Sequence, residues 1–203
     1  LPSNLQTLMG LRGQCFQTRW IHRLTDLRKL SIVQVSSSTV KMLSVLSPGP
    51  IMLPDTLEVL KLYFWGPVSE QINLSSYQNI VKLHLNGVAE TPSNSEAFPP
   101  NLIKLTLGYL EVDSHLLAVL KKLPKLRILK MEWCEYEAEE MNLSCDANGD
   151  SFPQLEVLHI KHPRYLVEIT CTDDVSMPKL KKLIIVDLYY PIRLPERLAK
   201  LKI

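Results

Sequence analysis

The sequence has few cysteines, and their spacing does not suggest a metal site or a disulfide framework. Cys15, Cys134, Cys145 and Cys171 are far apart and form no C-x-x-C pair. Zinc-binding and disulfide-stapled domains need regularly spaced cysteines, often in such pairs. We therefore predict free thiols in a reducing compartment, and we exclude a cysteine framework as the basis of the fold.

Long apolar runs are also missing. No stretch approaches 18 consecutive apolar residues, and no signal peptide opens the chain. We therefore expect no membrane span. The sequence starts at Leu1-Pro2 inside what reads as a repeat pattern, so we expect it to be a fragment of a larger protein.

Neither a large excess of one charge nor an enzyme motif is present. The net charge is +2, with 23 basic and 21 acidic residues, so the global balance does not indicate a nucleic-acid or membrane partner. The sequence contains no G-x-S-x-G, H-E-x-x-H or G-x-G-x-x-G motif, and no G-x-x-x-x-G-K-[ST] phosphate loop. We therefore predict that the chain is not an enzyme and binds no cofactor.

The sequence does contain a repeat. The pattern L-x-x-L-x-L, with Ile or Met allowed, begins between 18 and 30 residues after the previous copy, close to the ~20–29 residues of leucine-rich repeats. We predict about nine such repeats in a single domain over residues 1–203. Their first apolar positions are 5, 27, 57, 80, 102, 126, 155, 180 and 198.

The spacing within the repeat predicts the architecture. Side chains of the L-x-L segment alternate with period two, so the leucines of a short strand point inward. One coil cannot bury its apolar face alone, but stacked neighbours can. We therefore expect an α/β solenoid, an irregular leucine-rich-repeat horseshoe. A parallel sheet would line its concave face, with loops or short helices on the convex side.

The connecting segments give further expectations. Ser114–Lys122 is the best helix candidate, with Asp113 or Ser114 as N-cap, and Ser36–Leu46 is a second. The acidic segment Glu135–Asp150 is interpreted as a mobile loop. Prolines two or three residues before a repeat's first leucine suit the turn into a strand, because proline fixes φ and donates no N–H. They are Pro2, Pro54, Pro100, Pro124, Pro153, Pro178 and Pro195.

Charge is unevenly distributed over this repeat. The 43 strand positions expected to face solvent hold 13 of the 23 Lys and Arg residues but only four of the 21 acids. Aromatic side chains lie on or beside the same strip, as anchors of protein interfaces often do. A basic strip would favour an acidic protein surface. The candidate partner-binding residues on the concave face are Lys29, Lys61, Tyr63, Phe64, Lys82, His84, Lys104, Tyr109, Lys130, Trp133, His159, Lys161 and Lys182.

A structural alternative exists for each of these residue types. The lysines could form an ordinary solvated sheet face, and the aromatic side chains could pack laterally or fill a repeat edge. Trp65 occupies a position where regular repeats carry an Asn, so packing is the favoured interpretation there.

Several phrases resemble one family of leucine-rich-repeat proteins. The Asn ladder of regular repeats is absent, and its positions hold residues such as Val35, Leu110 and Cys134. The phrase Asn4-Leu5-Gln6-Thr7-Leu8, the later Leu24-Thr25-Asp26-Leu27-Arg28-Lys29-Leu30, and the Phe-Pro-x-Leu-x-x-Leu phrase over 152–158 resemble plant intracellular immune receptors. The likeness is to the coiled-coil, nucleotide-binding, leucine-rich-repeat class.

The resemblance implies a function for the domain. It would sense a pathogen protein, including a viral effector, and restrain the adjacent nucleotide-binding domain. ATP or ADP would bind in that neighbouring domain, which is outside these residues. A cytoplasmic location is implied, with peripheral association to the plasma membrane in the full-length receptor as an alternative.

Two other functions fit a leucine-rich-repeat surface. One is the substrate-recognition module of an F-box ubiquitin ligase, which needs an F-box-like segment upstream. The other is polyanion binding through the basic strip, although no recognised nucleic-acid module is present and no nucleic-acid partner is expected.

Overall fold

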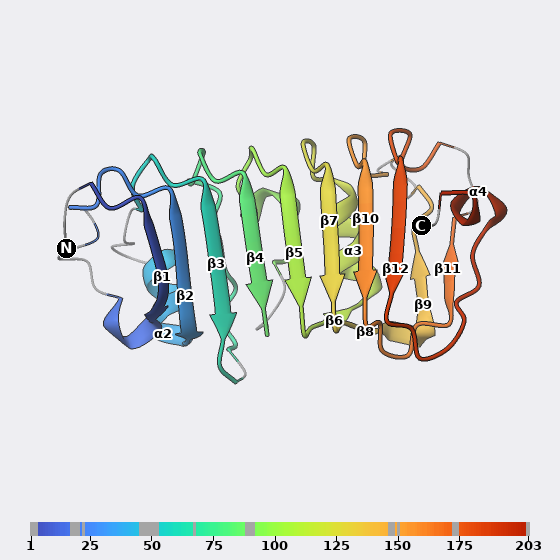
Figure 1. Cartoon of the computed structure of the whole chain (residues 1–203), viewed down its shortest axis with the longest axis horizontal. Coiled ribbons are helices and arrows are strands. Elements are labelled where there is room, and N and C mark those ends of the chain that lie inside the picture. Colours follow the sequence, from blue (N-terminus) through green and yellow to red (C-terminus); the bar gives the residue numbers. More distant parts are fainter. Residues whose placement is uncertain are drawn as a thin grey trace. The chain divides into compact units, whose positions relative to one another are not determined.

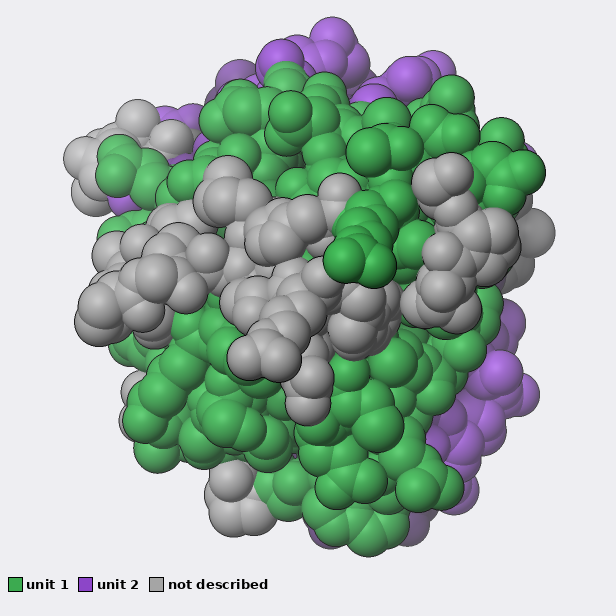
Figure 2. Space-filling view, turned by 90° about the vertical axis from the view of Figure 1, so that its left-hand side faces the viewer, with its two compact units in different colours: residues 1–102 green, residues 103–203 purple. Residues whose placement is uncertain are grey.

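The computed structural model describes residues 4–16, 21, 23–44, 53–66, 68–87, 92–145, 149, 151–171 and 175–201. Expectations for Pro2, Leu46, Asp150 and Lys202 therefore lie outside the described residues. The chain divides into two compact units, residues 1–102 and residues 103–203 (Figure 2). Each unit is described by itself.

The first unit is built on four strands that all run in the same direction (Figure 1). They are β1 (Thr7–Arg12), β2 (Lys29–Val35), β3 (Val59–Phe64) and β4 (Lys82–Asn86), paired in that order. The connections contain η1 (Gly13–Cys15), the helix α2 (Ser37–Leu43) and η2 (Ser95–Ala97).

The second unit repeats this plan and adds two strand pairs. The main strands are β5 (Lys104–Gly108), β7 (Ile128–Glu132), β10 (Val157–Lys161) and β12 (Lys182–Val186), parallel and paired in that order. Shorter strands pair in the connections: β6 (Glu111–Val112) with β8 (Glu135–Tyr136), and β9 (Glu140–Asn142) with β11 (Glu168–Thr170). The helical segments are α3 (Ser114–Lys121), η3 (Glu137–Glu139) and α4 (Glu196–Ala199).

The repeated leucines form the core of each unit. Leu60 and Leu62 of β3 are fully buried, and so are Leu158 and Ile160 of β10, while the residues between them stay partly exposed. This alternation is the period-two pattern that the sequence predicted. The fold class is confirmed as a leucine-rich-repeat α/β architecture with a parallel sheet and with loops and short helices in the connections.

The backbone confirms the repeat register. The residue after each first leucine accepts two consecutive N–H groups from the next repeat. The carbonyl of Arg28 accepts from Glu58 at 2.9 Å and from Val59 at 3.0 Å. In the second unit, the carbonyl of Arg127 accepts from the two corresponding residues of β10's repeat. Within each unit, neighbouring repeats are therefore joined at the same point of the coil.

The turns that lead into the strands have the predicted proline chemistry. The N–H of Leu57 donates to the carbonyl of Pro54 at 2.9 Å, and the N–H of Leu102 donates to Pro99 at 3.1 Å. Equivalent bonds join Leu155 to Phe152 and Leu180 to Met177, and a proline follows the acceptor in both turns. Proline suits these positions because its fixed φ matches a tight turn.

A different polar ladder replaces the missing Asn ladder. The residue immediately before the first leucine reaches back to the preceding repeat. Asn79 donates to the carbonyl of Asp55 at 2.6 Å, and Asn101 donates to Gln78 at 2.8 Å. The Thr56 hydroxyl donates to Thr25 and Leu27 in the same way. These bonds satisfy backbone carbonyls before the strand of a repeat, whereas the Asn ladder of regular repeats lies after the strand.

The two expected helices are present. α3 begins after Asp113, whose carboxylate accepts from the N–H of Leu116 at 2.7 Å, so Asp113 is the N-cap. α2 falls within the range predicted from Ser36 onward, but its N-cap side chain makes no capping bond. No helix in the described ranges is long and apolar enough to cross a membrane.

Two sequence expectations are corrected. Residues 135–142, the first part of the acidic segment, are not a mobile loop: they form β8, η3 and β9, and Met141 and Leu143 are buried while the acids stay exposed. In β1, Leu11 rather than Gly10 aligns with Ile32, because Gly10 with φ +73° allows a bulge.

The last repeat copy does not continue as a strand in the described residues. Glu196–Ala199 form helix α4, which contains the first leucine of that copy. The N–H of Leu183 in β12 nevertheless donates to the carbonyl of Leu201 at 3.1 Å. The apolar pattern therefore located a core residue, since Leu198 is fully buried, and the strand expected from Leu201 onward lies largely outside the described residues.

Candidate protein-binding surfaces

Register places the predicted side chains in rows on the outward face of each sheet, which we call the sheet face. In the first unit, Lys61 of β3 lies between Ser31 and His84 on the adjacent strands. A parallel row contains Lys29, Val59 and Lys82. The period-two geometry of strands makes these rows face the side opposite the buried leucines.

Three lysines of the first sheet face are not neutralised. Lys29 and Lys82 are exposed and Lys61 is half-buried. Within the part of the chain that the structure describes, no carboxylate lies within ion-pair distance of any of the three. Beside them the rings of Tyr63 and His84 lie 5.1 Å apart, tilted by 35°. This face therefore combines positive charge with an amphipathic ring.

The second unit has the same arrangement. Lys130 of β7 aligns with His159 of β10, and Thr106 and Ile184 continue that row on either side. The neighbouring row has lysines at both of its ends and apolar residues in its middle. Its members are Lys104, Ile128, Val157 and Lys182.

The pKa of His159 is lowered by its surroundings. Partial burial is the largest cause, followed by repulsion from the Lys130 ammonium and opposed by Glu132; Lys161 and Lys104 add to the repulsion. The sheet face of this unit is thus a positively charged environment that disfavours a further positive charge. An acidic group placed there would relieve that repulsion.

Other basic residues counted in the strip are already paired across repeats. Arg28 bonds to Glu58, and Glu156 is held between Arg127 and Lys181, the latter at 3.0 Å. Hydrogen bonds from Lys181 and then Arg127 lower the pKa of Glu156. In each unit these pairs lie in the row at the start of the strands, and the unneutralised lysines of the sheet face lie in the rows beyond it.

Phe64 and Trp65 differ from their sequence-based interpretations. Phe64 aligns with the fully buried Val35, so the alternation of β3 puts it on the core side, away from Tyr63. Trp65 was expected to pack, yet it is 76% exposed. Phe64 is half-buried on the core side, and its place in the partner-binding set stays a prediction, whereas Trp65 is exposed.

Just beyond the carboxyl ends of the main strands of the second unit, one residue per repeat has a strained backbone conformation. Two residues past each L-x-L segment, Tyr109, Trp133, His162 and Asp187 all have positive φ, between 47° and 59°. A left-handed conformation costs a non-glycine residue roughly 1–2 kcal/mol. In the first unit the same position holds Gln34, also with a positive φ of 54°, and Gly87, which avoids the penalty. In the second unit three of the four side chains held at this position are rings.

Three of these rings stack, and a fourth ring, tilted against them, extends the series. We call this series the aromatic edge and define it as Tyr109, Trp133, His162 and Tyr189. Tyr109 and Trp133 stack with centroids 5.8 Å apart, and Trp133 and His162 stack at 3.8 Å. Tyr189 extends the series at 6.4 Å from His162. The His162 Nε2 lies 3.0 Å from Asp187, which fixes the imidazole ring.

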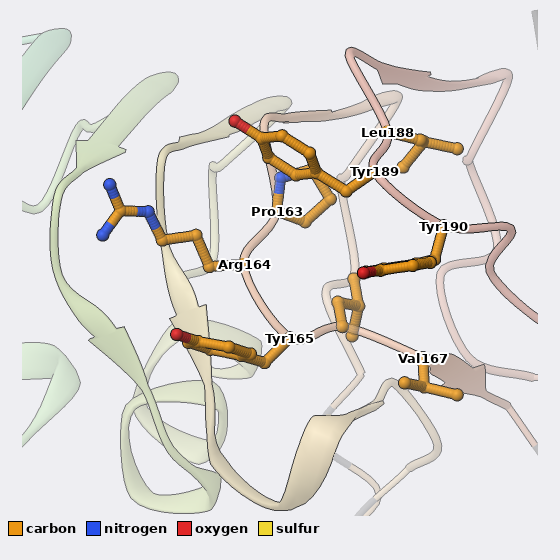
Figure 3. A pocket seen from close by; sticks show the side chains of 8 residues that line it. Pro163, Arg164, Tyr165, Val167, Leu188, Tyr189 and Tyr190 are labelled. Atoms are coloured by element: carbon orange, nitrogen blue, oxygen red, sulfur yellow. The ribbon is translucent and has the colours of Figure 1, made fainter.

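A pocket opens beside the aromatic edge (Figure 3). It has a volume of about 320 Å³, at the lower end of ligand-sized cavities. Tyr165, Tyr189 and Tyr190 surround the opening, and they are among the most exposed aromatic residues of the described chain. We call this the tyrosine pocket; its lining is Pro163, Arg164, Tyr165, Leu166, Val167, Leu188, Tyr189 and Tyr190.

Sequence reasoning found Tyr109 and Trp133 but missed the rest of this region. His162 occupies the repeat position equivalent to Trp133, so a position-by-position comparison of repeats could have grouped the two rings. Tyr165, Tyr189 and Tyr190 lie in irregular connections, where no periodic signal predicts which side chains meet.

The cysteines lie in different environments. No disulfide joins Cys15, Cys134, Cys145 or Cys171. Burial raises the pKa of the fully buried Cys134 to about 12, so this thiol stays protonated. Within the described ranges, no group of three or more His, Cys, Asp or Glu residues could hold a metal ion.

Comparisons with known proteins identify close relatives. No protein-family model matches the chain. It is 60% identical over 200 residues to the tomato (Solanum lycopersicum) "ToMV resistance protein Tm-2(2)" and 61% identical to the tomato "ToMV susceptible protein tm-2". Each match covers 98% of this chain and 23% of the relative, so the chain spans about a quarter of its relatives' length.

Proposed function

Because the chain is a close homologue of part of the tomato ToMV resistance proteins, we propose that it is the sensing region of a plant immune receptor. Its sheet face would dock an acidic protein surface. The observation that carries the proposal is the set of unneutralised lysines on the sheet faces, Lys29, Lys61, Lys82, Lys130 and Lys182.

Charge complementarity gives the docking its selectivity. Outward lysines without a carboxylate partner attract an acidic surface over a long range and repel a basic one. The rows that contain these lysines also hold the half-buried apolar residues Val59, Ile128 and Val157, so a docked partner would also remove apolar surface from water.

Two acidic partners are proposed for this face. One is the nucleotide-binding domain of the same receptor, which would bind ATP or ADP, and the other is a viral protein. If both use the same lysines, each weakens the binding of the other, and the viral protein releases the restraint on the neighbouring domain. The similarity to resistance proteins favours this function over an F-box ubiquitin ligase module.

Charge reversal in the full-length receptor tests this function. The triple change Lys61→Glu, Lys82→Glu and Lys130→Glu should abolish restraint and cause cell death in the absence of virus. A matched control, Lys41→Glu, Lys179→Glu and Lys200→Glu, makes the same charge change outside the sheet-face rows. A resting, ToMV-responsive receptor carrying the first triple change would refute the proposed dock.

A further inference from the structure

We propose that the tyrosine pocket binds an uncharged apolar side chain of a partner protein, leucine- or proline-sized, carried by a segment with acidic residues. The acidic part of this inference rests on the proposed function; the apolar part rests on the pocket alone. Together they assign a two-part recognition site to the second unit.

The walls of the pocket suit an apolar group. Leu188 and Val167 supply aliphatic surface, and Pro163 is buried at the base. Tyr165, Tyr189 and Tyr190 are 69%, 65% and 77% exposed. Rigid rings with an apolar body and a polar tip lose little conformational entropy on binding, which is why tyrosine is enriched in protein interfaces.

The charges around the pocket are already satisfied. The Arg164 guanidinium donates to Glu135 at 3.1 Å, and Lys161 lies 3.8 Å from Asp187. On β11, which follows the pocket-lining residue Val167, Glu168 pairs with Arg193 at 2.9 Å. A charged ligand group would therefore have to break an existing pair, whereas an uncharged one would not.

The tyrosine hydroxyls can hold a docked backbone. Within the described chain, the hydroxyls of Tyr165, Tyr189 and Tyr190 have no hydrogen-bond partner. A phenol can donate to a peptide carbonyl and accept from a peptide N–H. These three groups would thus orient an extended segment while its side chain enters the pocket.

The same segment can reach the basic rows. β10 ends at Lys161, His162 follows, and the pocket lining begins at Pro163. Lys130 and His159 lie side by side in the row next to this end of the strand. An acidic residue of the segment that reaches this row would meet the unneutralised Lys130 ammonium, which is why we assign a protein segment and not a small apolar molecule.

Peptide selection tests the inference without knowledge of the natural partner. A random dodecapeptide phage library is selected on the immobilised 203-residue chain, and enriched peptides are synthesised for affinity measurement. We expect an apolar residue flanked by Asp or Glu. The double change Tyr165→Ser and Tyr190→Ser should weaken binding at least tenfold, whereas Trp65→Ser, a change of an exposed aromatic outside the pocket, should leave it within twofold.

The outcomes separate the two parts of the site. Circular dichroism melts of the variants, whose changed side chains are exposed, verify folding. Acidic peptides that have no apolar position, or that bind the tyrosine variant normally, overturn the pocket assignment and leave the basic dock intact. Apolar peptides without acids that still need the tyrosines support the pocket and contradict the electrostatic dock. A selection that enriches no peptide overturns the inference.

Discussion

The basic side chains of this protein differ in whether an acidic side chain lies within ion-pair distance. Arg28, Arg127 and Lys181 sit beside glutamates from neighbouring repeats, and such exposed pairs contribute little net stability, about 0–1 kcal/mol each. Lys61 and Lys130 have no such partner among the described residues. The repeat register alone predicts which basic residues face outward, so the sequence could locate both the paired and the unpaired ones. It could not tell the two groups apart, because pairing depends on which residues of two repeats are neighbours.

The environment of His159 predicts a pH effect on stability. Its pKa in the folded chain is below 6.5, so the folded state resists protonation and stability falls as pH drops below about 6.5. Replacing His159 by Gln should reduce the loss of melting temperature between about pH 7.5 and pH 5.5. The variant His115→Gln, at an exposed position, should lose as much melting temperature over this pH range as the wild type. An equal loss in the wild type and both variants would contradict this account.

Burial of Cys134 predicts resistance to alkylation. Because its pKa is raised to about 12, the thiolate needed for reaction is scarce near pH 8. Mass spectrometry after brief iodoacetamide treatment should show the exposed Cys15 modified and Cys134 unmodified. In denaturant both should react. Rapid labelling of Cys134 in the folded chain would mean that this part of the core opens readily.

Two helices of the connections provide a test of local stabilisation. The Asp113 carboxylate caps α3, so Asp113→Ala should lower the free energy of unfolding by about 0.5–2 kcal/mol. Ser36 is the N-cap of α2 but makes no capping bond, so Ser36→Ala should cost less. Urea unfolding compares the two variants, and a larger loss for Ser36→Ala would contradict the assignment.

The core of β7 offers a second test among the elements. Leu129 is fully buried between the strands of adjacent repeats, so Leu129→Ala should cost about 2–5 kcal/mol. Ile128 faces outward and is half-buried, so Ile128→Ala should lower the free energy of unfolding by less than Leu129→Ala. Urea denaturation measures both, and equal losses would show that the alternation assigned to β7 is wrong.

The elements show where sequence periodicity stops being informative. It located the strands because leucines at fixed spacing have one way to be buried together. Phe64 differs from Tyr109 and Trp133 because the strand β3 continues extended through Phe64, whereas at the two other residues a left-handed turn brings the side chain to the edge. The backbone conformation of a single residue decides between these outcomes, and no periodic pattern encodes it.

For the whole molecule, net charge is a poor guide to function. A chain with a net charge of +2 carries five unneutralised lysines on its sheet faces and pairs many of its acids within the connections or across repeats. The tyrosine pocket could not be predicted at this scale, because its rings come from two irregular connections that only the folded chain brings together.

A binding titration tests the central claim most directly. The chain would be titrated with the separately expressed nucleotide-binding region of the same gene, at low and at high salt. The account predicts salt-sensitive binding that Lys61→Glu, Lys82→Glu and Lys130→Glu together weaken about tenfold or more, since exposed charge pairs contribute about 0.2–1 kcal/mol each. No binding, or binding that neither salt nor charge reversal changes, would contradict it.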